Sequence, residues 1–151
     1  MDSATFARIS RAVCPTILSD VQALPSLPDV VAVHDEKMAE CLAGSTPLVV
    51  SGHLHVNAAW VDRGTQYLQV GTTGGGGPIL TNDAGPQPLS AQVLYFRPGS
   101  PPTLVAYDNI VQNPDTGTLT VERHLVTAHE LEPPRPSPPS LTPSTSPTTT
   151  P

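Results

Sequence analysis

Two short, continuous apolar runs constrain the fold of this chain more than any other feature. Residues 29–34 read DVVAVH, and residues 47–51 read PLVVS. Continuous β-branched and apolar runs of this length are typical of strands that are buried on both faces, as in parallel sheets. The two runs therefore predict an α/β fold in which they form neighbouring strands.

The segment between the two runs has a helical pattern. Met38, Cys41 and Leu42 form one apolar stripe within residues 36–43, and Gly44 provides a stop. Two buried strands joined by one helix indicate a βαβ-like unit.

A short helix is also expected at residues 4–14. Phe6, Ile9 and Val13 have the three- and four-residue spacing of a helix face, and Pro15 is expected to end the helix.

The second half of the chain favours strands without helices. Turn-forming residues occupy 71–77, 98–102 and 113–117. The expected strands between them are residues 66–70, 91–97, 103–110 and 118–126. The last turn separates two β-rich runs and predicts a hairpin.

The sharpest chemical feature is the sequence SGHLH at residues 51–55. If the strand stays extended, its period of two sends His53 and His55 to one face. Neutral imidazole is a common ligand for zinc and related metals, although an HxH sequence alone is equally compatible with a surface turn.

His34 strengthens the metal interpretation. It ends the first apolar run, and the carboxyl ends of parallel neighbouring strands meet at the same edge of a sheet. A single histidine at a strand end is more often a hydrogen-bonding residue. Convergence of three histidines from two loops is harder to explain by packing.

These motifs resemble a known family. The sequences PDVVAVHD at residues 28–35 and PLVVSGHLH at residues 47–55 are similar to the two C-terminal motifs of the calcineurin-like metallophosphoesterases. The glycine-rich segment that begins VGTTGGG at residue 70, and the strands after it, extend the resemblance over residues 28–129. The resemblance implies a partial four-layer α/β/β/α sandwich and a two-metal centre that hydrolyses phosphate mono- or diesters.

Carried over to this chain, the family motifs make His34 and His53 ligands of one divalent metal and His55 a ligand of the other. Manganese, iron and zinc are not distinguished. The family's earlier motifs, DxH, GDxxD and GNH(D/E), are absent from residues 1–33. The bridging carboxylate, the Asn ligand and the catalytic histidine are therefore missing, and no catalytic residue is assigned.

The sequence thus predicts a C-terminal fragment of a metal-dependent phosphoesterase that is inactive alone. A phosphate-ester substrate is expected only if the missing N-terminal half completes the site. The alternative is a small, non-catalytic metal-binding or interaction module with a Pro/Thr-rich linker tail.

Other candidate residues have simpler interpretations. Asp35 is expected to cap the following helix, and Asp62, beside Arg63 in a loop, is expected to be a surface charge. Gly74 to Gly77 lack the lysine of a phosphate-binding loop and predict a permissive turn. His124 and His129 are expected to have structural roles.

Composition sets the remaining expectations. Residues 1–131 are expected to fold as one domain portion, whereas residues 132–151 form a Pro/Ser/Thr-rich tail expected to be disordered. Seven Lys and Arg residues and a net charge of −6 argue against nucleic-acid binding. Cys14 and Cys41 are expected to be reduced, buried thiols. No signal peptide or membrane span is visible, so a cytoplasmic location is the default, and the oligomeric state stays open.

Overall fold

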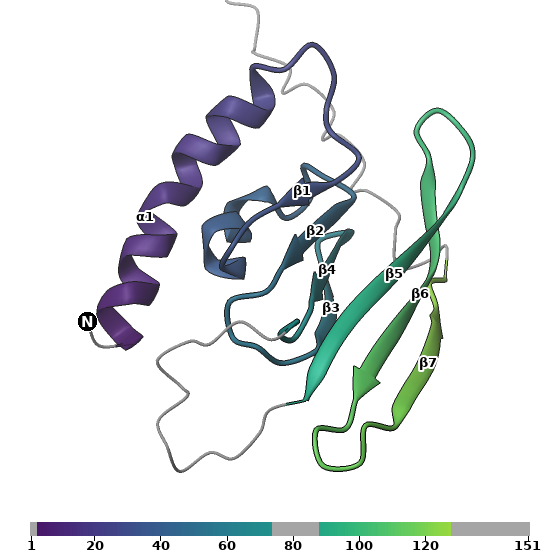
Figure 1. Cartoon of the computed structure of the whole chain (residues 1–151). Helices are drawn as coiled ribbons and strands as arrows, with labels where there is room; N and C mark the ends of the chain where they lie inside the picture. Colours follow the sequence, from purple (N-terminus) through teal and green to yellow (C-terminus); the bar gives the residue numbers. More distant parts are fainter. Residues whose placement is uncertain (1–2, 74–87, 128–151) are drawn as a thin grey trace, which may run out of the picture.

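The computed structural model describes residues 3–73 and 88–127. These residues form a mixed α/β arrangement with two sheets. Helices cover one side of the first sheet, and the second sheet lies on its other side (Figure 1). The elements are α1 (Ser3–Gln22), β1 (Val31–Ala32), the 3-10 helix η1 (Glu36–Leu42), β2 (Leu48–Ser51), β3 (Ala58–Asp62), β4 (Thr65–Gln69), β5 (Leu89–Arg97), β6 (Thr103–Gln112) and β7 (Leu119–Leu125).

The first sheet, sheet A, has the strand order β1-β2-β4-β3. β1 and β2 are parallel neighbours, with Val31 opposite Val49, as the two apolar runs predicted. β4 is parallel to β2, and β3 is antiparallel to β4. Sequence analysis missed β3, which pairs with β4 through a tight turn at Arg63 and Gly64. Both turn residues have positive φ, 49° and 85°, as two-residue hairpin turns of type I′ require.

The second sheet, sheet B, is an antiparallel meander in the order β5-β6-β7. All three strands were expected. The hairpin between β6 and β7 is confirmed, and Gly117 in its turn has φ 71°. Asn113 organises this turn, because its Oδ1 accepts hydrogen bonds from the backbone N–H groups of Asp115 and Thr116.

Two apolar cores explain why the strands of sheet A have continuous apolar sequences. Val49 and Tyr67 belong to the core on the helical side, whereas Leu48 and Leu68 belong to the core shared with sheet B. Successive side chains of a strand point to opposite faces, so each strand supplies both cores. Burying one leucine completely, as at Leu68, contributes about 1.5–3 kcal/mol.

The helices differ from expectation in two respects. α1 does not end at Pro15 but continues to Gln22. Ile17, Leu18 and Val21 pack against the core of sheet A, and this packing outweighs the hydrogen bond that proline cannot donate. The helix expected at residues 36–43 is a 3-10 helix.

The buried face of α1 is also different from the stripe read from the sequence. Ile9 and Val13 are exposed, whereas Ser10 and Cys14 are buried. Cys14 forms a disulfide with Cys41 of η1, so the expectation of two reduced thiols was wrong. The cysteines are 27 residues apart in sequence, and only the packing of α1 along η1 brings them together.

Three layers of the expected four-layer sandwich are present among the described residues: helices, sheet A and sheet B. The outer face of sheet B presents exposed apolar side chains, including Leu119, Val121 and Leu125. Gly74 to Gly77, His129 and residues 132–151 lie outside the described residues, so the predictions for them stay predictions. Within the described residues, neither helix combines the length and the apolar character that crossing a membrane demands.

Candidate metal site at the ends of β1 and β2

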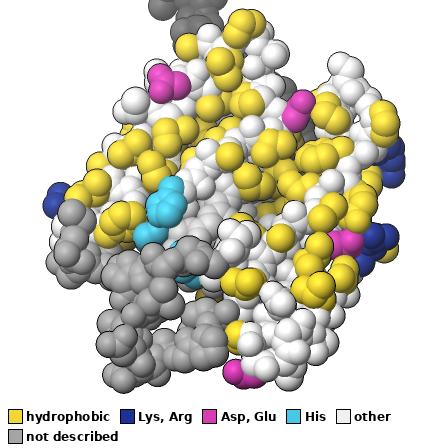
Figure 2. Space-filling view, in the orientation of Figure 1, with side chains coloured by type: hydrophobic (Ala, Val, Ile, Leu, Met, Phe, Trp, Pro, Cys, Tyr) yellow, Lys and Arg dark blue, Asp and Glu magenta, His cyan; other side chains and the backbone are white. Residues whose placement is uncertain are grey.

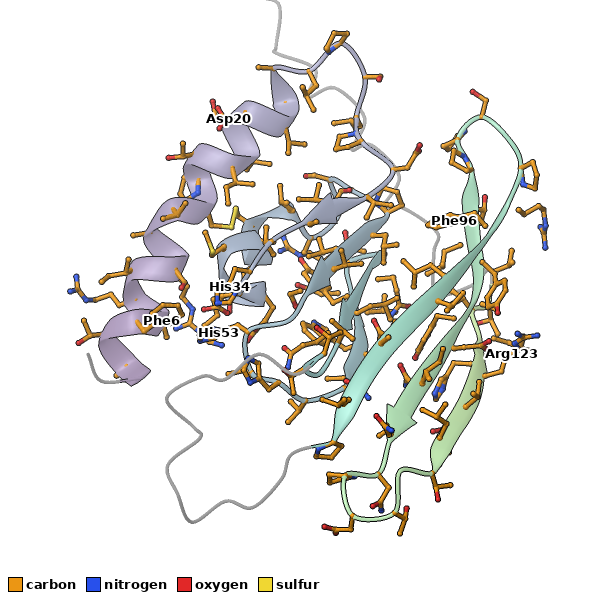
Figure 3. All side chains as sticks on the ribbon, in the orientation of Figure 1. Phe6, Asp20, His34, His53, Phe96 and Arg123 are labelled. Carbon is orange, nitrogen blue, oxygen red and sulfur yellow. A yellow bond between two sulfur atoms is a disulfide. The ribbon has the colours of Figure 1, made fainter. Side chains whose placement is uncertain are left out.

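The strand pairing of sheet A brings His34 and His53 together. Backbone hydrogen bonds continue beyond the two strands, from Val33 N to Val50 O at 3.0 Å and from Gly52 N to His34 O at 3.3 Å. Nδ1 of His53 lies 2.9 Å from Nε2 of His34, and their ring centroids are 4.7 Å apart. The two imidazoles meet at the carboxyl edge of the parallel strands, beside the first turns of α1 (Figure 3).

Phe6 of α1 is the third member of this cluster, and sequence analysis did not assign it there. Its ring stacks on the His53 imidazole with centroids 4.4 Å apart and planes 18° apart. Phe6 therefore covers one face of the His53 ring. The spacing of Phe6, Ser10 and Cys14 at four-residue intervals is the sequence signal that places Phe6 on the buried face of α1.

His55 does not follow the extended geometry expected of it. The chain turns at His53 and Leu54, and His55 has φ 57°, in the left-handed region. The two-residue alternation of an extended strand, which was expected to place His53 and His55 on one face, therefore does not continue after Ser51. Across residues 3–73 and 88–127, no three side chains among His, Cys, Asp and Glu are grouped so that they could hold one ion.

The separation of His34 and His53 is compatible with a shared divalent ion. Two nitrogens at about 2.05 Å from one ion are about 2.9 Å apart at a 90° angle and about 3.3 Å apart at the tetrahedral angle. The observed 2.9 Å equals the first value, and a widening of about 0.4 Å reaches the second. The two residues therefore fit two positions of a metal site, and the remaining ligands must come from elsewhere.

Asp35 and Asp62, the two acids that follow the histidine motifs in sequence, do not complete the site. Asp35 caps η1, because its Oδ1 accepts a hydrogen bond from Lys37 N at 3.1 Å. Burial disfavours its ionised form, but hydrogen bonds from Lys37 N and the Ser10 side chain hold the pKa of Asp35 below its usual value. Asp62 ends β3 and forms an exposed ion pair with Arg63 at 3.5 Å. It is a surface charge, as expected, but in a strand.

His124 has the structural role that was expected. Its ring stacks on Tyr107 with centroids 4.7 Å apart, and its Nε2 lies 3.2 Å from Nδ2 of Asn109. These contacts fix the ring on the inner face of β7, on a different sheet from the strands that His34 and His53 follow.

One cavity lies at the opposite end of sheet A. It has a volume of about 1030 Å³, and its lining includes Asp29 and Pro47, which precede β1 and β2. The histidines follow these strands. The cavity and the histidine pair are therefore separate features.

The comparisons with known proteins give little support to any family or function for this chain. The chain matches no protein-family model and no curated protein. Among solved structures, it is similar to a single-mutant Vps29 from Entamoeba histolytica, with 13% identity and a TM-score of 0.43. The alignment covers 69% of this chain and 64% of that chain, so it spans less than two thirds of the Vps29 chain. A likeness at this level carries no weight for function, and the interpretation of the site rests on its own residues.

Proposed function

We propose that this chain is the C-terminal portion of a calcineurin-like phosphoesterase and is inactive alone. His34 and His53 supply two ligands to one divalent metal, and His55 supplies one to a second metal. The observation that supports this proposal is the 2.9 Å approach of His53 Nδ1 to His34 Nε2 at the carboxyl edge of two parallel strands.

The chemistry divides between this chain and groups that it lacks. When bound, the metals would polarise the phosphoryl group and supply a hydroxide nucleophile. This chain's part is to hold neutral imidazoles in a fixed geometry, which the backbone hydrogen bond from Gly52 N to His34 O supports. Two dications repel each other at short range, so acidic ligands from another segment or chain must complete the centre.

A zinc titration of the full chain carrying Cys14→Ser and Cys41→Ser tests the metal ligands. The serine substitutions remove the thiols, which would otherwise bind zinc themselves. We expect the ring signals of His34 and His53 to shift together in NMR spectra. His53→Ala should abolish the saturable shift of His34, whereas His124→Ala, which removes a histidine on another sheet, should leave it intact.

Two results would contradict the metal assignment. One is the absence of any saturable shift at His34 and His53. The other is zinc binding that survives His53→Ala but is lost in His124→Ala.

The second candidate is an interaction module, and the outer face of sheet B favours it. Leu119, Val121 and Leu125 are 64%, 61% and 75% exposed on β7, which is an edge strand. Hydrophobic side chains also cover much of the molecular face that Figure 2 shows, although on β7 Arg123 lies between Val121 and Leu125. The partner in this candidate is a second copy of the chain, because an edge strand can pair with the same strand of another copy.

Sedimentation separates the two candidates. A dimer that Val121→Glu converts to a monomer supports the interaction module. A chain that is monomeric at all concentrations would rule out the interaction module.

A further inference from the structure

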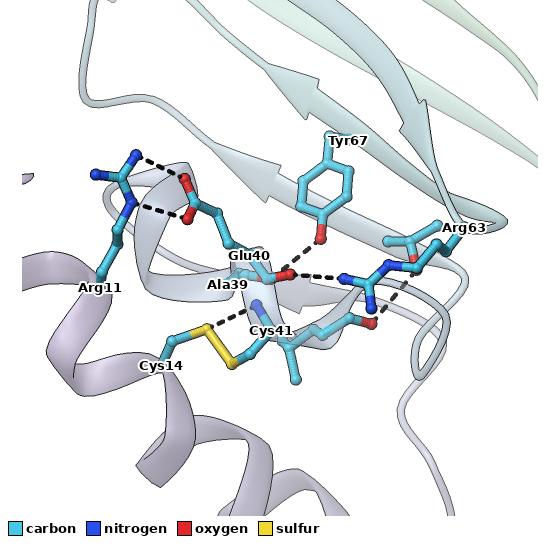
Figure 4. The surroundings of a disulfide bond; sticks show 9 residues. Arg11, Cys14, Ala39, Glu40, Cys41, Arg63 and Tyr67 are labelled. Atoms are coloured by element: carbon cyan, nitrogen blue, oxygen red, sulfur yellow. Dashed lines mark hydrogen bonds and ion pairs between the residues drawn. A yellow bond between two sulfur atoms is a disulfide. The ribbon is translucent and has the colours of Figure 1, made fainter.

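The N-terminal half of α1 lies over His53, while His34 beside it is exposed. Phe6 stacks on His53, Arg11 forms an ion pair with Glu40 at 2.9 Å, and Cys14 is bonded to Cys41. Figure 4 shows the ion pair and the disulfide side by side, both joining α1 to η1. The only covalent contact among these three is the disulfide.

The other two contacts are weak. Arg11 and Glu40 have side chains that are 55% and 48% exposed, and ion pairs in water contribute little to stability. Phe6 is half-buried, and its ring contact in this cluster is with His53. The buried Ser10 adds a side-chain hydrogen bond to Asp35, the residue that caps η1. The disulfide is therefore a covalent tie that several weaker contacts accompany.

The C-terminal half of α1 is attached differently. Ile17, Leu18 and Val21 pack into the apolar core with Leu42 and Val49. This half therefore stays docked on sheet A whether or not the disulfide is present.

Pro15 lies at the boundary between the two halves. It has no N–H to donate to the carbonyl of Arg11, and a proline ring crowds that carbonyl. Kinks in helices concentrate at such positions. The helix thus has a built-in weak point immediately after Cys14, the residue that ties its first half down.

We propose that the Cys14–Cys41 disulfide is a redox latch that holds the N-terminal half of α1 over His53, beside the exposed His34. Reduction by a dithiol breaks the Sγ–Sγ bond and transfers two electrons and two protons to give two thiols, while the dithiol becomes a disulfide. Residues 3–14 then move about Pro15, Phe6 leaves His53, and the face of the His53 ring that Phe6 covered becomes accessible to metal. The consequence for metal binding rests on the proposed function, whereas the release of the helix does not.

Hydrogen exchange on the full chain tests the latch directly. Reduction should speed the exchange of amides in residues 7–14 at least tenfold and leave the rate in residues 17–22 unchanged. The ring protons of His53 should shift at the same time, because they lose the ring current of Phe6. Unchanged exchange in residues 7–14 would overturn the latch, whatever the metal results.

Zinc affinity tests the consequence for the site. The Cys14→Ser, Cys41→Ser variant should bind zinc at least tenfold more tightly than the oxidised wild-type chain. Phe6→Ala should strengthen binding with the disulfide intact, and Ile9→Ala, on the exposed face of the same helix, should not. Pro15→Ala should slow the opening of residues 7–14 after reduction, because it restores a helical donor.

The outcomes separate the two proposals. Fast exchange on reduction with no zinc binding in any form supports the latch and removes the proposed metal site. Fast exchange on reduction, with equal zinc affinity in the oxidised wild-type chain and the Cys14→Ser, Cys41→Ser variant, would overturn the proposal that α1 controls access to the histidines.

Discussion

Nδ1 of His53 lies 2.9 Å from Nε2 of His34, although the residues are 19 apart in sequence. Neither histidine is within a strand. Each follows a strand of sheet A, and the parallel register of β1 and β2 sets their positions. The pair is therefore a product of the strand pairing.

The first prediction is that the purified chain has no phosphodiesterase or phosphomonoesterase activity with added manganese, zinc or iron. The described residues offer no cluster of three or more ligands, and a two-metal centre needs a bridging carboxylate. Hydrolysis of a chromogenic phosphodiester is the measurement. Metal-dependent turnover that disappears in His53→Ala would contradict the prediction, and turnover that survives the substitution would indicate a contaminant.

A second prediction concerns the contribution of the disulfide to stability. The Cys14–Cys41 bond closes a loop with a sequence separation of 27, and removing such a bond typically costs about 2–4 kcal/mol in the free energy of unfolding. Urea denaturation of the Cys14→Ser, Cys41→Ser variant should show this loss. The wild-type chain in a reducing buffer is the matched control and should lose a similar amount. An unchanged midpoint in both would mean that the bond does not form in solution.

Much of sheet A could be predicted from the sequence, because Val49 and Leu48 face different cores and leave a continuous apolar run. β3 could not, since its apolar residues Trp60 and Val61 are 37% and 39% exposed and give no burial pattern. The local sequence pattern of α1 also could not show which of its faces is buried.

The candidate site was likewise predictable from the sequence only in part. The meeting of His34 and His53 follows from parallel pairing, which the sequence indicates. The stacking of Phe6 on His53 depends on how α1 docks against η1, and that docking is a tertiary property. The direction of His55 depends on a left-handed turn at a non-glycine residue, for which the sequence carries no clear signal.

A third prediction is that acid weakens sheet B through Asp108. Arg123 donates two hydrogen bonds of 2.8 Å to its carboxylate, and Tyr95 donates a third of 2.8 Å. The Arg123 hydrogen bond outweighs the opposing effect of burial and lowers the pKa of Asp108 from 3.8 to about 2. Because the folded-state pKa is the lower one, the stabilisation is complete above about pH 4 and is lost as the pH falls toward 2.

Unfolding monitored by circular dichroism between pH 5 and pH 2 measures this effect. Asp108→Asn should be less stable at pH 5 and should lose less stability than the wild type over that range. A wild-type chain and a variant with parallel pH profiles would contradict the assignment.

A fourth prediction concerns the C-terminal tail, which lies outside the described residues. Residues 133–151 contain almost no apolar side chains, so they offer no face that could join either core. Truncation after Glu132 should leave the melting temperature unchanged within error. A clear decrease would show that the tail packs on the domain.

The last prediction concerns Gly71, at the junction between the two sheets. A Cβ atom at this position would clash with Ser90 Oγ and would lie 3.3 Å from Ser90 Cβ. Ser90 is buried, and its backbone N–H donates a 2.7 Å hydrogen bond to Thr72 O, so it has little room to move. Gly71→Ala should therefore lower the free energy of unfolding by about 1–3 kcal/mol, the usual cost of overpacking.

Gly52→Ala is the matched control for Gly71→Ala, because its Cβ would make an ordinary 3.5 Å contact with Val70. It should cost much less than Gly71→Ala in the same denaturation experiment. Ser90→Ala removes the clashing oxygen, so the double variant Gly71→Ala, Ser90→Ala should recover part of the lost stability. Since Ser90 Oγ has no hydrogen-bond partner among residues 3–73 and 88–127, its removal alone should cost little. Additive losses in the double variant would show that the oxygen is not the source of the cost, and that the junction between the sheets is more loosely packed than these distances imply.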